Sequence, residues 1–322
     1  MVERSNAATG HAVAVARLLL VLSLPLGMHQ SAQAQPASDV PADDVRVRMP
    51  LQVQPLRPGL NVVLGAGGNV VVWSGPDGVV LVDSGLASRA PDLFETLARI
   101  APGDLRFLVN THGHVDHTGG NAAAAQRGAV LIGHESLRDW AGSDAAVSTS
   151  DSNTDEMPAG ARPIVTTTDR LTLHLNGDRL DVLHVAAAHT AFDLVTRWDQ
   201  ADVVALGDLY WSGQYPYIDA AAGGSLAGTV AAVEAALARA NARTLFVPGH
   251  GPVSNRAELA AYRDMLVAVG RKVREAVEQG AGLEQVLATH PSAEFDARYA
   301  RPGASVSPEQ FVRNVYADLT RK

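Results

Sequence analysis

The sequence predicts an α/β fold in which two β-sheets pack face to face and helices cover their outer faces. Short apolar runs of strand length alternate with longer segments of helix length along most of the chain, as is typical of α/β proteins. A group of strands closed by helices occurs twice, before and after a polar stretch at residues 141–161. The length suffices for one large domain or two small ones, and we expect a single domain over residues 50–322.

The first half begins with three short strands. Apolar runs of strand length occur at residues 60–64, 70–73 and 79–82. Glycine-rich turns at 65–68 and 75–78 separate them. The first turn is followed by a strand, whereas a dinucleotide-binding fingerprint needs a helix there, so that kind of site is excluded. The other elements expected in this half are helices at 91–100 and 121–127 and strands at 107–110 and 129–132.

The second half begins with a hairpin. Apolar runs at 171–175 and 180–185 flank the dipeptide Asn176-Gly177, which favours a two-residue hairpin turn. The elements expected after it are strands at 194–198, 203–206 and 244–247 and helices at 226–240 and 256–279.

Residues 1–34 have the composition of a secretory signal peptide. Arg4 and Arg17 precede an apolar stretch at 18–28, and Ala32-Gln33-Ala34 places small residues at a cleavage spacing. The apolar stretch is shorter than the roughly 20 residues of a membrane span. We expect this segment to be removed on export, which leaves a protein of the Gram-negative periplasm without membrane attachment. The alternative is a retained anchor.

The remaining composition limits the partners and the metal ligands. Residues 35–49 are rich in Pro, Ala and Asp and are expected to form a linker. The formal net charge is −8 at pH 7, and an acidic surface disfavours a nucleic-acid partner, so a small-molecule substrate is expected. The chain has no cysteine. Any metal must therefore be bound by His, Asp or Glu, which suits zinc, iron or manganese.

The densest group of chemically active side chains follows the apolar run at 107–109. The segment from Thr111 to His117 contains three imidazoles and one carboxylate. Its spacing is not the i, i+4 spacing of metal-binding histidines on a helix. In an extended chain, His112 and His114 point the same way and can share one metal. Asp116 and His117 face another direction, which suits a second metal.

Residues of ligand type also follow four other predicted strands. They are Asp83, His189, Asp208 and His250. Sites in α/β sheets gather at the carboxyl ends of strands, where loops converge on a rigid scaffold. Each of these residues alone would be an ordinary turn, surface or core residue. Because the same arrangement recurs, we expect the side chains to meet at one edge of the sheets.

Taken together, these segments resemble the metallo-β-lactamase-fold superfamily. The matching pieces are, in order, 82–85, 112–117, 188–190, 207–208 and 248–251. The resemblance implies an αβ/βα four-layer sandwich with a two-metal site on its edge. It further implies a ligand set in which His112, His114 and His189 hold the first metal, Asp116, His117 and His250 hold the second, Asp208 bridges the two, and Asp83 braces the histidine loop.

The chemistry of this donor set indicates a hydrolase. Neutral imidazoles and two carboxylates would leave two Zn²⁺ ions with a net charge of about +2, enough to ionise a bridging water near neutral pH. We expect an exported dinuclear zinc enzyme, with iron or manganese as alternatives, whose bridging hydroxide cleaves an ester, thioester, lactone or amide. The expected catalytic carboxylates are Asp208, which holds both metals, and Asp116. Either Asp116 or a metal-bound water is expected to protonate the leaving atom.

An aromatic run directly after Asp208 is the candidate substrate lining. Its members are Tyr210, Trp211, Tyr215 and Tyr217. Their proximity in sequence to a ligand favours a place near the metals, and the alternative is a packing cluster under a loop.

The other histidines of the expected domain lie outside these ligand-bearing segments. We expect His134, His174, His184 and His290 to be structural. Among them, His184 precedes His189 by only five residues and lies on the same approach to the site.

Several alternatives to a general hydrolase stay open. Asp208 stands where genuine metallo-β-lactamases have cysteine or serine and looks more like glyoxalase II, and the turn at 65–68 is too short for an apolar flap. A periplasmic β-lactamase is nevertheless the first alternative. A redox protein is the second, although di-iron oxidoreductases of this fold tend to have a carboxylate at the position of His114. The third is a non-catalytic metal-binding accessory protein, because ligands indicate binding more directly than turnover.

Overall fold

Two β-sheets form the centre of the computed structural model, which describes residues 50–142 and 157–321. The expected signal peptide and linker lie outside the described residues, as does most of the expected polar connection between the halves. The described residues belong to one compact unit. Within these ranges, no helix combines the length and the apolar character needed to span a membrane.

The first sheet has seven strands in sequential order. Its first four strands are antiparallel neighbours, and the strands from the fourth to the seventh run parallel. The edge strands β1 and β7 were not predicted. β1 contains Pro55 and is largely exposed, and β7 is only three residues long, so neither shows a buried apolar run. The strands are β1 (Gln52–Arg57), β2 (Leu60–Leu64), β3 (Val70–Gly75), β4 (Gly78–Val82), β5 (Leu105–Val109), β6 (Val130–His134) and β7 (Val165–Thr167).

The second sheet has six strands in the order β13-β12-β11-β10-β9-β8. Its first hairpin turns at Asn176 and Gly177, which both have positive φ (50° and 76°), so the predicted hairpin is confirmed. Strands β11 and β12 are parallel and therefore end at the same edge. The strands are β8 (Arg170–Leu175), β9 (Asp178–Val185), β10 (Asp193–Trp198), β11 (Val203–Ala205), β12 (Leu245–Val247) and β13 (Ser254–Asn255).

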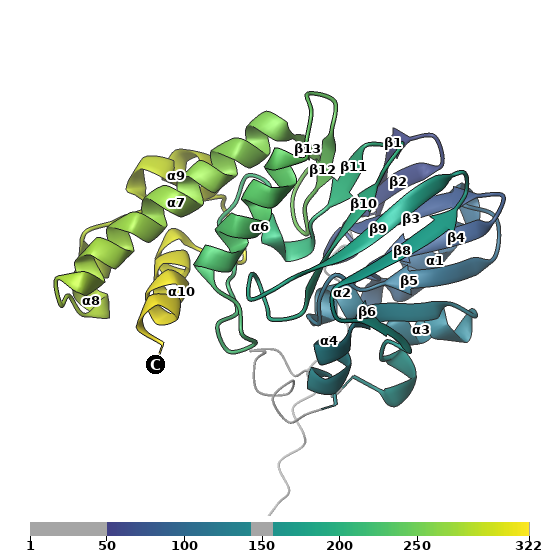
Figure 1. The fold of residues 1–322 in the computed structure, drawn as a ribbon, viewed down its shortest axis with the longest axis horizontal. Helices are drawn as coiled ribbons and strands as arrows, with labels where there is room; N and C mark the ends of the chain where they lie inside the picture. The colour runs from purple at the N-terminus through teal and green to yellow at the C-terminus, as the bar shows by residue number, and fades with distance from the viewer. Residues whose placement is uncertain (1–49, 143–156, 322) are drawn as a thin grey trace, which may run out of the picture. The chain divides into compact units, whose positions relative to one another are not determined.

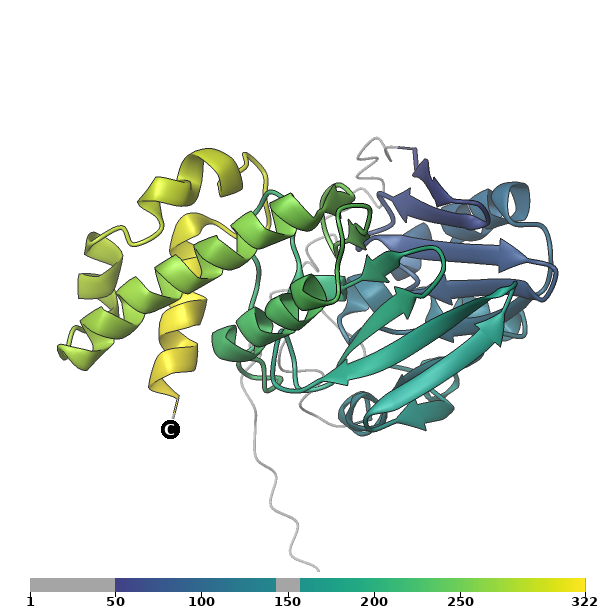
Figure 2. The ribbon, with the colours of Figure 1, turned by 45° about the horizontal axis from the view of Figure 1, so that its top comes forward.

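Helices cover the outer faces of both sheets, as Figures 1 and 2 show. Helices α1 and α3 lie on the first sheet, and α6 and α7 lie on the second. The helices are α1 (Ala90–Ile100), α2 (Val115–Thr118), α3 (Asn121–Gln126), α4 (Glu135–Trp140), α6 (Leu226–Ala238), α7 (Arg256–Glu278), α8 (Leu283–Ala288), α9 (Ala293–Tyr299) and α10 (Pro308–Thr320). Short 3₁₀ turns complete the set at η1 (Ala87–Arg89), η2 (Ala159–Ala161) and η3 (Gly207–Leu209).

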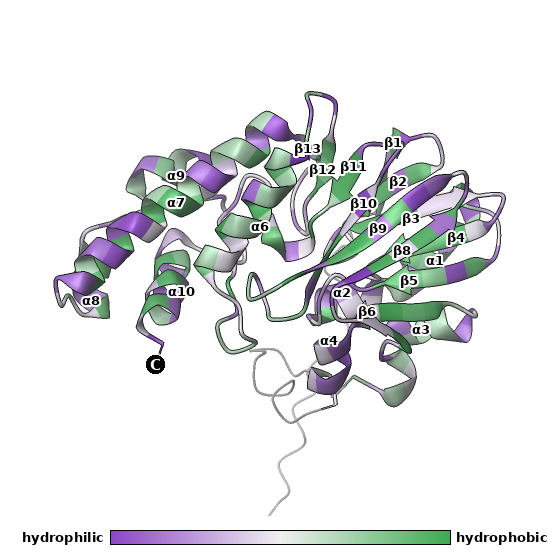
Figure 3. Cartoon of the chain, in the orientation of Figure 1, coloured by the Kyte–Doolittle hydropathy of each residue, from purple (hydrophilic) through white to green (hydrophobic). Residues whose placement is uncertain are grey.

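Buried apolar side chains form three layers between these elements. The middle layer joins the two sheets, where Trp73 of β3 packs edge-to-face on Trp198 of β10 with ring centroids 6.1 Å apart. The outer layers lie under α1 and α3 on one side and under α6 and α7 on the other. Figure 3 shows the corresponding pattern, with largely apolar strands and with helices in which apolar and polar residues are interspersed. The predicted two-sheet sandwich with outer helices is therefore confirmed.

The C-terminal helices α8, α9 and α10 extend the fold beyond the last element predicted from the sequence. Phe311 and Val315 of α10 and Tyr299 of α9 are buried in the same apolar layer as α7. The side chain of Ser307 caps α10 by accepting a hydrogen bond from the backbone N–H of Gln310. These helices thus become part of the core under the second sheet.

Candidate metal centre

The structure brings all seven predicted metal ligands together at one edge of the two sheets. They form two adjoining groups, and within each group one ligand atom per residue lies within 4.8 Å of the others. The side chains come from loops after β5, β9, β11 and β12, as expected for sites at the carboxyl ends of strands. The first group is His112, His114, His189 and Asp208, and the second is Asp116, His117 and His250.

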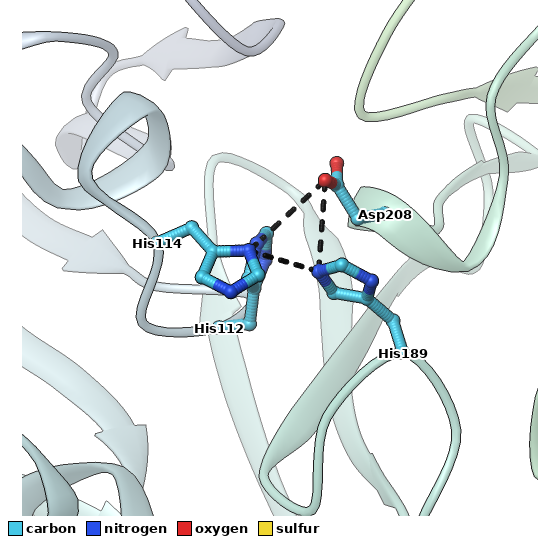
Figure 4. A group of neighbouring side chains, drawn as sticks. All are labelled: His112, His114, His189 and Asp208. Atoms are coloured by element: carbon cyan, nitrogen blue, oxygen red, sulfur yellow. Dashed lines mark hydrogen bonds and ion pairs between the residues drawn. The ribbon is translucent and has the colours of Figure 1, made fainter. Parts of the chain in front are cut away.

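In the first group, three ring nitrogens converge on one point (Figure 4). His114 Nδ1 lies 3.2 Å from His112 Nε2 and 3.0 Å from His189 Nε2. Asp208 Oδ2 lies 3.8 Å from His112 Nε2 and 3.6 Å from His189 Nε2. Three nitrogens and one oxygen around a common centre are a donor set that suits zinc.

The second group is built in the same way around one carboxylate and two imidazoles. His117 Nε2 and His250 Nε2 are 3.5 Å apart. Asp116 Oδ2 lies 3.2 Å from His250 Nε2 and 3.5 Å from His117 Nε2. The backbone N–H of Gly68 donates a hydrogen bond to the Asp116 carbonyl (2.9 Å). The short turn at 65–68 therefore lies on the ligand side of the sheet.

Asp208 lies between the two groups and presents one oxygen to each. Its Oδ2 faces His112 and His189, whereas its Oδ1 lies 3.1 Å from His117 Nε2 and 3.5 Å from His250 Nε2. Oδ1 is buried and receives no hydrogen bond from the described residues. A buried carboxylate oxygen facing ring nitrogens without a donor fits a position that a cation would complete.

The outer ring nitrogens of His114 and His189 determine which atom each presents to the centre. His114 Nε2 lies 3.0 Å from Asp219 Oδ2, and His189 Nδ1 lies 2.9 Å from the Tyr217 carbonyl oxygen. A carboxylate and a carbonyl can only accept, so these nitrogens carry the hydrogens and donate them. His114 Nδ1 and His189 Nε2 therefore point lone pairs inward, as metal ligands must.

Asp83 orients the other two buried histidines. It accepts hydrogen bonds from the N–H and Oγ1 of Thr111 (2.7 and 2.8 Å) and from His117 Nδ1 (2.8 Å). Because Thr111 Oγ1 gives its hydrogen to Asp83, it accepts one from His112 Nδ1 (3.0 Å). Both His112 and His117 consequently turn Nε2 toward the centre. Asp83 achieves this with a left-handed backbone (φ 64°), a conformation uncommon outside glycine, asparagine and aspartate.

The electrostatics of the metal-free protein differ between the two groups. Burial lowers the pKa of His189 to about 4 and that of His112 well below its usual range, so both are neutral at pH 7. Burial also opposes the charged form of His250, but Asp208 and Asp116 outweigh it and raise the His250 pKa to about 9. Burial raises the pKa of Asp208, but the surrounding histidines outweigh this effect and bring the pKa well below its usual range. The bridging carboxylate is therefore ionised.

These observations fit two divalent cations in this place. Four histidines have outer hydrogen bonds that direct a lone pair inward, and an ionised carboxylate lies between the two groups. In the first group, buried lone pairs that face one another at 3.0–3.2 Å repel, and a cation between them removes that repulsion. His112, His114 and His189 would hold one ion, Asp116, His117 and His250 the other, and Asp208 both.

Asp219 is a part of the site that the sequence analysis did not identify. It is fully buried, and its Oδ1 accepts a hydrogen bond from the backbone of Ala222 (2.9 Å) while Oδ2 holds His114. It lies in the loop after the aromatic run, far from any strand end. The only local signal was its position two residues beyond Tyr217.

The aromatic run after Asp208 divides into two pairs. Tyr210 and Tyr215 are 1% and 0% exposed and pack in the core, where the Tyr215 hydroxyl donates to Asp296 Oδ1 (2.7 Å). Trp211 and Tyr217 lie beside the histidines. The Trp211 ring is 4.3 Å from the His250 ring, and the Tyr217 ring is 6.2 Å from the His114 ring, measured between centroids.

The remaining histidines of the described chain lie outside both groups. The rings of His134 and His184 stack with centroids 3.9 Å apart, and His184 Nε2 donates to the Ala191 carbonyl (3.1 Å). His174 and His290 are exposed.

Comparisons with known proteins agree with this arrangement. A family model described as "Metallo-beta-lactamase superfamily" matches residues 64–251. The rat Metallo-beta-lactamase domain-containing protein 1 is 42% identical over 60 residues, which are 18% of this chain and 24% of the rat protein. The match thus spans about a quarter of that relative.

Several solved structures share the fold at low sequence identity. A metallo-beta-lactamase from Pontibacter korlensis has a TM-score of 0.55 at 21% identity and covers 67% of this chain and 99% of its own. A metallo-beta-lactamase from Cronobacter sakazakii has a TM-score of 0.58 at 20% identity, covering 73% and 98%. The stereoselective inverting sec-alkylsulfatase Pisa1 from Pseudomonas sp. has a TM-score of 0.62 at 16% identity, covering 83% and 50%.

Proposed function

Because this chain belongs to the metallo-beta-lactamase superfamily, we propose that it is a dinuclear zinc hydrolase that cleaves an ester, thioester, lactone or amide. The observation that carries the proposal is the position of Asp208, with one carboxylate oxygen directed to each histidine group. A carboxylate placed in this way supports two ions rather than one. Two metals in such a site polarise a carbonyl and lower the pKa of water, which are the requirements of hydrolysis near pH 7.

The exposure of the ligand side chains indicates where a substrate enters. The side chains of Asp116, His114 and His250 retain 28%, 21% and 19% exposure, whereas those of His112, His117, His189 and Asp208 retain 3% or less. A substrate therefore reaches the centre past Asp116. Burial raises the pKa of Asp116, but His117 and His250 outweigh it and bring the pKa to about 2. Asp116, a partly exposed carboxylate at the entrance, or a water bound at the metals would pass the proton to the leaving atom.

Metal analysis combined with ester hydrolysis tests this proposal. The purified protein should contain about two zinc ions per chain and should hydrolyse activated esters, lactones or thioesters. Asp208→Asn removes the negative charge between the groups, so metal affinity should fall about 10–100-fold or more, with the second ion lost first. The matched control is Asp181→Asn, a buried aspartate whose partners are Arg170, Thr172 and Arg179. Unchanged metal content and rate in Asp208→Asn would refute the bridging role.

Cephalosporin hydrolysis is the first alternative activity, and the same preparation distinguishes it. The bridging Asp208 adds negative charge where an anionic β-lactam would be seated, and the turn at 65–68 is too short to close over a ring. We expect kcat/KM for an activated ester, lactone or thioester to exceed that for a chromogenic cephalosporin by at least ~100-fold, about 2.7 kcal/mol in the barrier. A faster reaction with the cephalosporin would make β-lactam hydrolysis the better assignment. A secondary alkyl sulfate belongs in the same panel, because the sec-alkylsulfatase Pisa1 shares the fold.

We propose, in addition, that the enzyme works in the periplasm of a Gram-negative bacterium. The support is the sequence of residues 1–34, with two arginines before a short apolar stretch and a small-residue cleavage spacing. N-terminal sequencing of the protein from a periplasmic fraction should begin near Gln35. Recovery of intact residues 1–34 in a membrane fraction would show instead that this segment is retained as an anchor.

A further inference from the structure

A buried aspartate that is not a ligand, Asp193, holds the loop that carries His189. It is the first residue of β10. Its Oδ2 accepts a hydrogen bond from the backbone N–H of Thr190 (2.8 Å), and its Oδ1 accepts one from the Thr190 hydroxyl (2.6 Å). A buried carboxylate needs hydrogen-bond donors, and here these two donors belong to the residue directly after a metal ligand. The position of the His189 loop is therefore tied to the start of β10.

The same arrangement occurs beside His112. There Asp83 accepts hydrogen bonds from the N–H and the Oγ1 of Thr111, which directly precedes the ligand. Thr190 directly follows its ligand and gives Asp193 the same two kinds of hydrogen bond. The two pairs belong to different sheets, because Asp83 follows β4 of the first sheet whereas Asp193 begins β10 of the second. Each sheet thus holds one histidine loop with an aspartate and a threonine.

A backbone hydrogen bond joins these two pairs between the sheets. The N–H of Leu194, the residue after Asp193, donates to the Thr111 carbonyl oxygen (2.7 Å). The residues that make these hydrogen bonds are all buried, so water does not compete for them. The first two residues of β10 therefore tie the His189 loop to the His112 loop, and the two imidazole rings lie 4.6 Å apart between centroids.

A different segment ties His189 to His114, the third histidine of the group. Asp219 holds His114 Nε2 with its carboxylate, and its backbone N–H donates to the His189 carbonyl oxygen (3.0 Å). Asp193 supplies the corresponding tie toward His112. Because the distances from zinc to its ligands vary by only about 0.2 Å, both ties affect how well the three ring nitrogens fit one ion.

We propose that Asp193 and Thr190 are positioning residues of the metal centre, which hold His189 at the distance from His112 that binding of the first ion requires. This inference rests on the proposed zinc centre, and it is independent of the bond that the enzyme cleaves. Neither residue belongs to the two ligand groups. Their replacement therefore leaves the ligand set complete and changes only its geometry.

The test is a zinc competition with a chromophoric chelator, combined with the melting temperature of the zinc-free protein. Asp193→Ala removes both hydrogen bonds, so affinity for the first ion should fall about tenfold. Thr190→Val removes only the hydroxyl and keeps the shape, so the loss should be smaller. In Asp193→Asn the amide oxygen can accept the Thr190 N–H, and the amide nitrogen can donate to the Thr190 hydroxyl. This variant should retain most of the affinity.

The matched control is Asp181→Ala, at a buried aspartate of β9 that also accepts a threonine hydroxyl, that of Thr172 (2.9 Å). It should lower the melting temperature and leave zinc affinity unchanged. If Asp193→Ala and Thr190→Val lose no more affinity than Asp181→Ala, the positioning role is refuted. Affinity as low in Asp193→Asn as in Asp193→Ala also overturns it, because the hydrogen bonds would then not be what matters. An unmodified protein that binds no zinc refutes the proposed centre itself.

Discussion

At the scale of single residues, Asp219 controls how His114 is presented to the centre. It holds the outer nitrogen of His114 at 3.0 Å and is itself fully buried. Burial raises the Asp219 pKa, but the contact with His114 and the backbone N–H of Ala222 outweigh it, so the net pKa is lowered and the carboxylate is ionised. An ionised acceptor makes the imidazole a stronger metal ligand.

Asp219→Asn should therefore weaken metal binding at the first group. The amide keeps the shape of the side chain but loses its charge and brings a donor group near His114 Nε2. We expect affinity for the first zinc to fall about 10–100-fold in a chelator competition. Asp181→Asn, the change at a buried aspartate paired with Arg170, should leave zinc affinity as it is. Equal affinities in both variants would show that Asp219 only supports the loop.

Because the histidines differ in protonation, we expect the metal affinities of the two groups to respond differently to pH. At pH 7 in the metal-free protein His250, whose pKa is about 9, is cationic and carries an extra proton, whereas His189, with a pKa of about 4, is neutral. A metal at the second group must displace that proton, so its affinity should fall about tenfold per pH unit below 9 for each proton displaced. His112 and His189 are neutral and offer no such proton to displace, so affinity at the first group should fall less steeply with pH.

Dialysis against a weak chelator measures this difference. At pH 6 the protein should retain about one zinc ion per chain, and at pH 8.5 about two. Loss of both ions in one step would show that the two groups titrate as a single unit.

At the scale of elements, the turn between β2 and β3 positions the second metal group. Gly68 lies directly against the imidazole of His117, and a Cβ at this position would collide with the ring. The ring cannot retreat, because Asp83 holds its Nδ1 and Asp208 lies 3.1 Å from its Nε2. The Gly68 N–H of the same turn also donates a hydrogen bond to the Asp116 carbonyl oxygen. A segment about 50 residues upstream of the ligand loop thus sets its geometry.

Gly68→Ala should displace His117 and empty the second group while the fold survives. Overpacking of this kind costs about 1–3 kcal/mol of stability, and we expect ester hydrolysis to drop about 100-fold with one zinc ion retained. Gly160→Ala serves as the comparison, since a Cβ there meets nothing within 4 Å. Full activity and two zinc ions in Gly68→Ala would mean that His117 has room to move.

At the scale of the whole molecule, the segment 210–217 connects the metal centre to the C-terminal helices. Trp211 and Tyr217 contact the histidines, whereas Tyr215 between them points the other way into α9 and α10. There the Tyr215 ring stacks on Phe311 at 5.0 Å, and its hydroxyl donates to Asp296 of α9. Helices outside the residues matched by the family model therefore support the loop beside the centre.

Tyr215→Phe should lower the stability of the whole molecule without changing the metal centre. It removes a buried hydrogen bond to Asp296, which is worth about 1 kcal/mol. For a protein of this size the melting temperature should fall by about 2–4 °C, and zinc content should stay constant. Tyr316→Phe, a partly buried tyrosine on the same helix as Phe311, is the control for the loss of a hydroxyl. A loss of zinc in Tyr215→Phe would reveal tighter coupling than the ring contacts imply.

The sequence by itself determined the class of fold and the set of residues that meet at the centre. Apolar runs identified most strands of both sheets, because a buried strand must be apolar over its own length. Asp83, the histidine loop, His189, Asp208 and His250 each follow such a run, and the carboxyl ends of these strands lie at one edge. Only local pattern and donor chemistry were needed for this step.

Only the tertiary structure decided how these side chains are oriented and what surrounds them. The partner of His114 is Asp219, 105 residues further along the chain, and the sequence around either residue does not predict this contact. The direction of Tyr215 depended on α9 and α10, which the apolar pattern had not revealed, so Tyr215 is in the core whereas Tyr217 is beside the centre. Periodicity records which face of a short element is buried, but hydrogen bonds and ring contacts between distant segments depend on the packed chain as a whole.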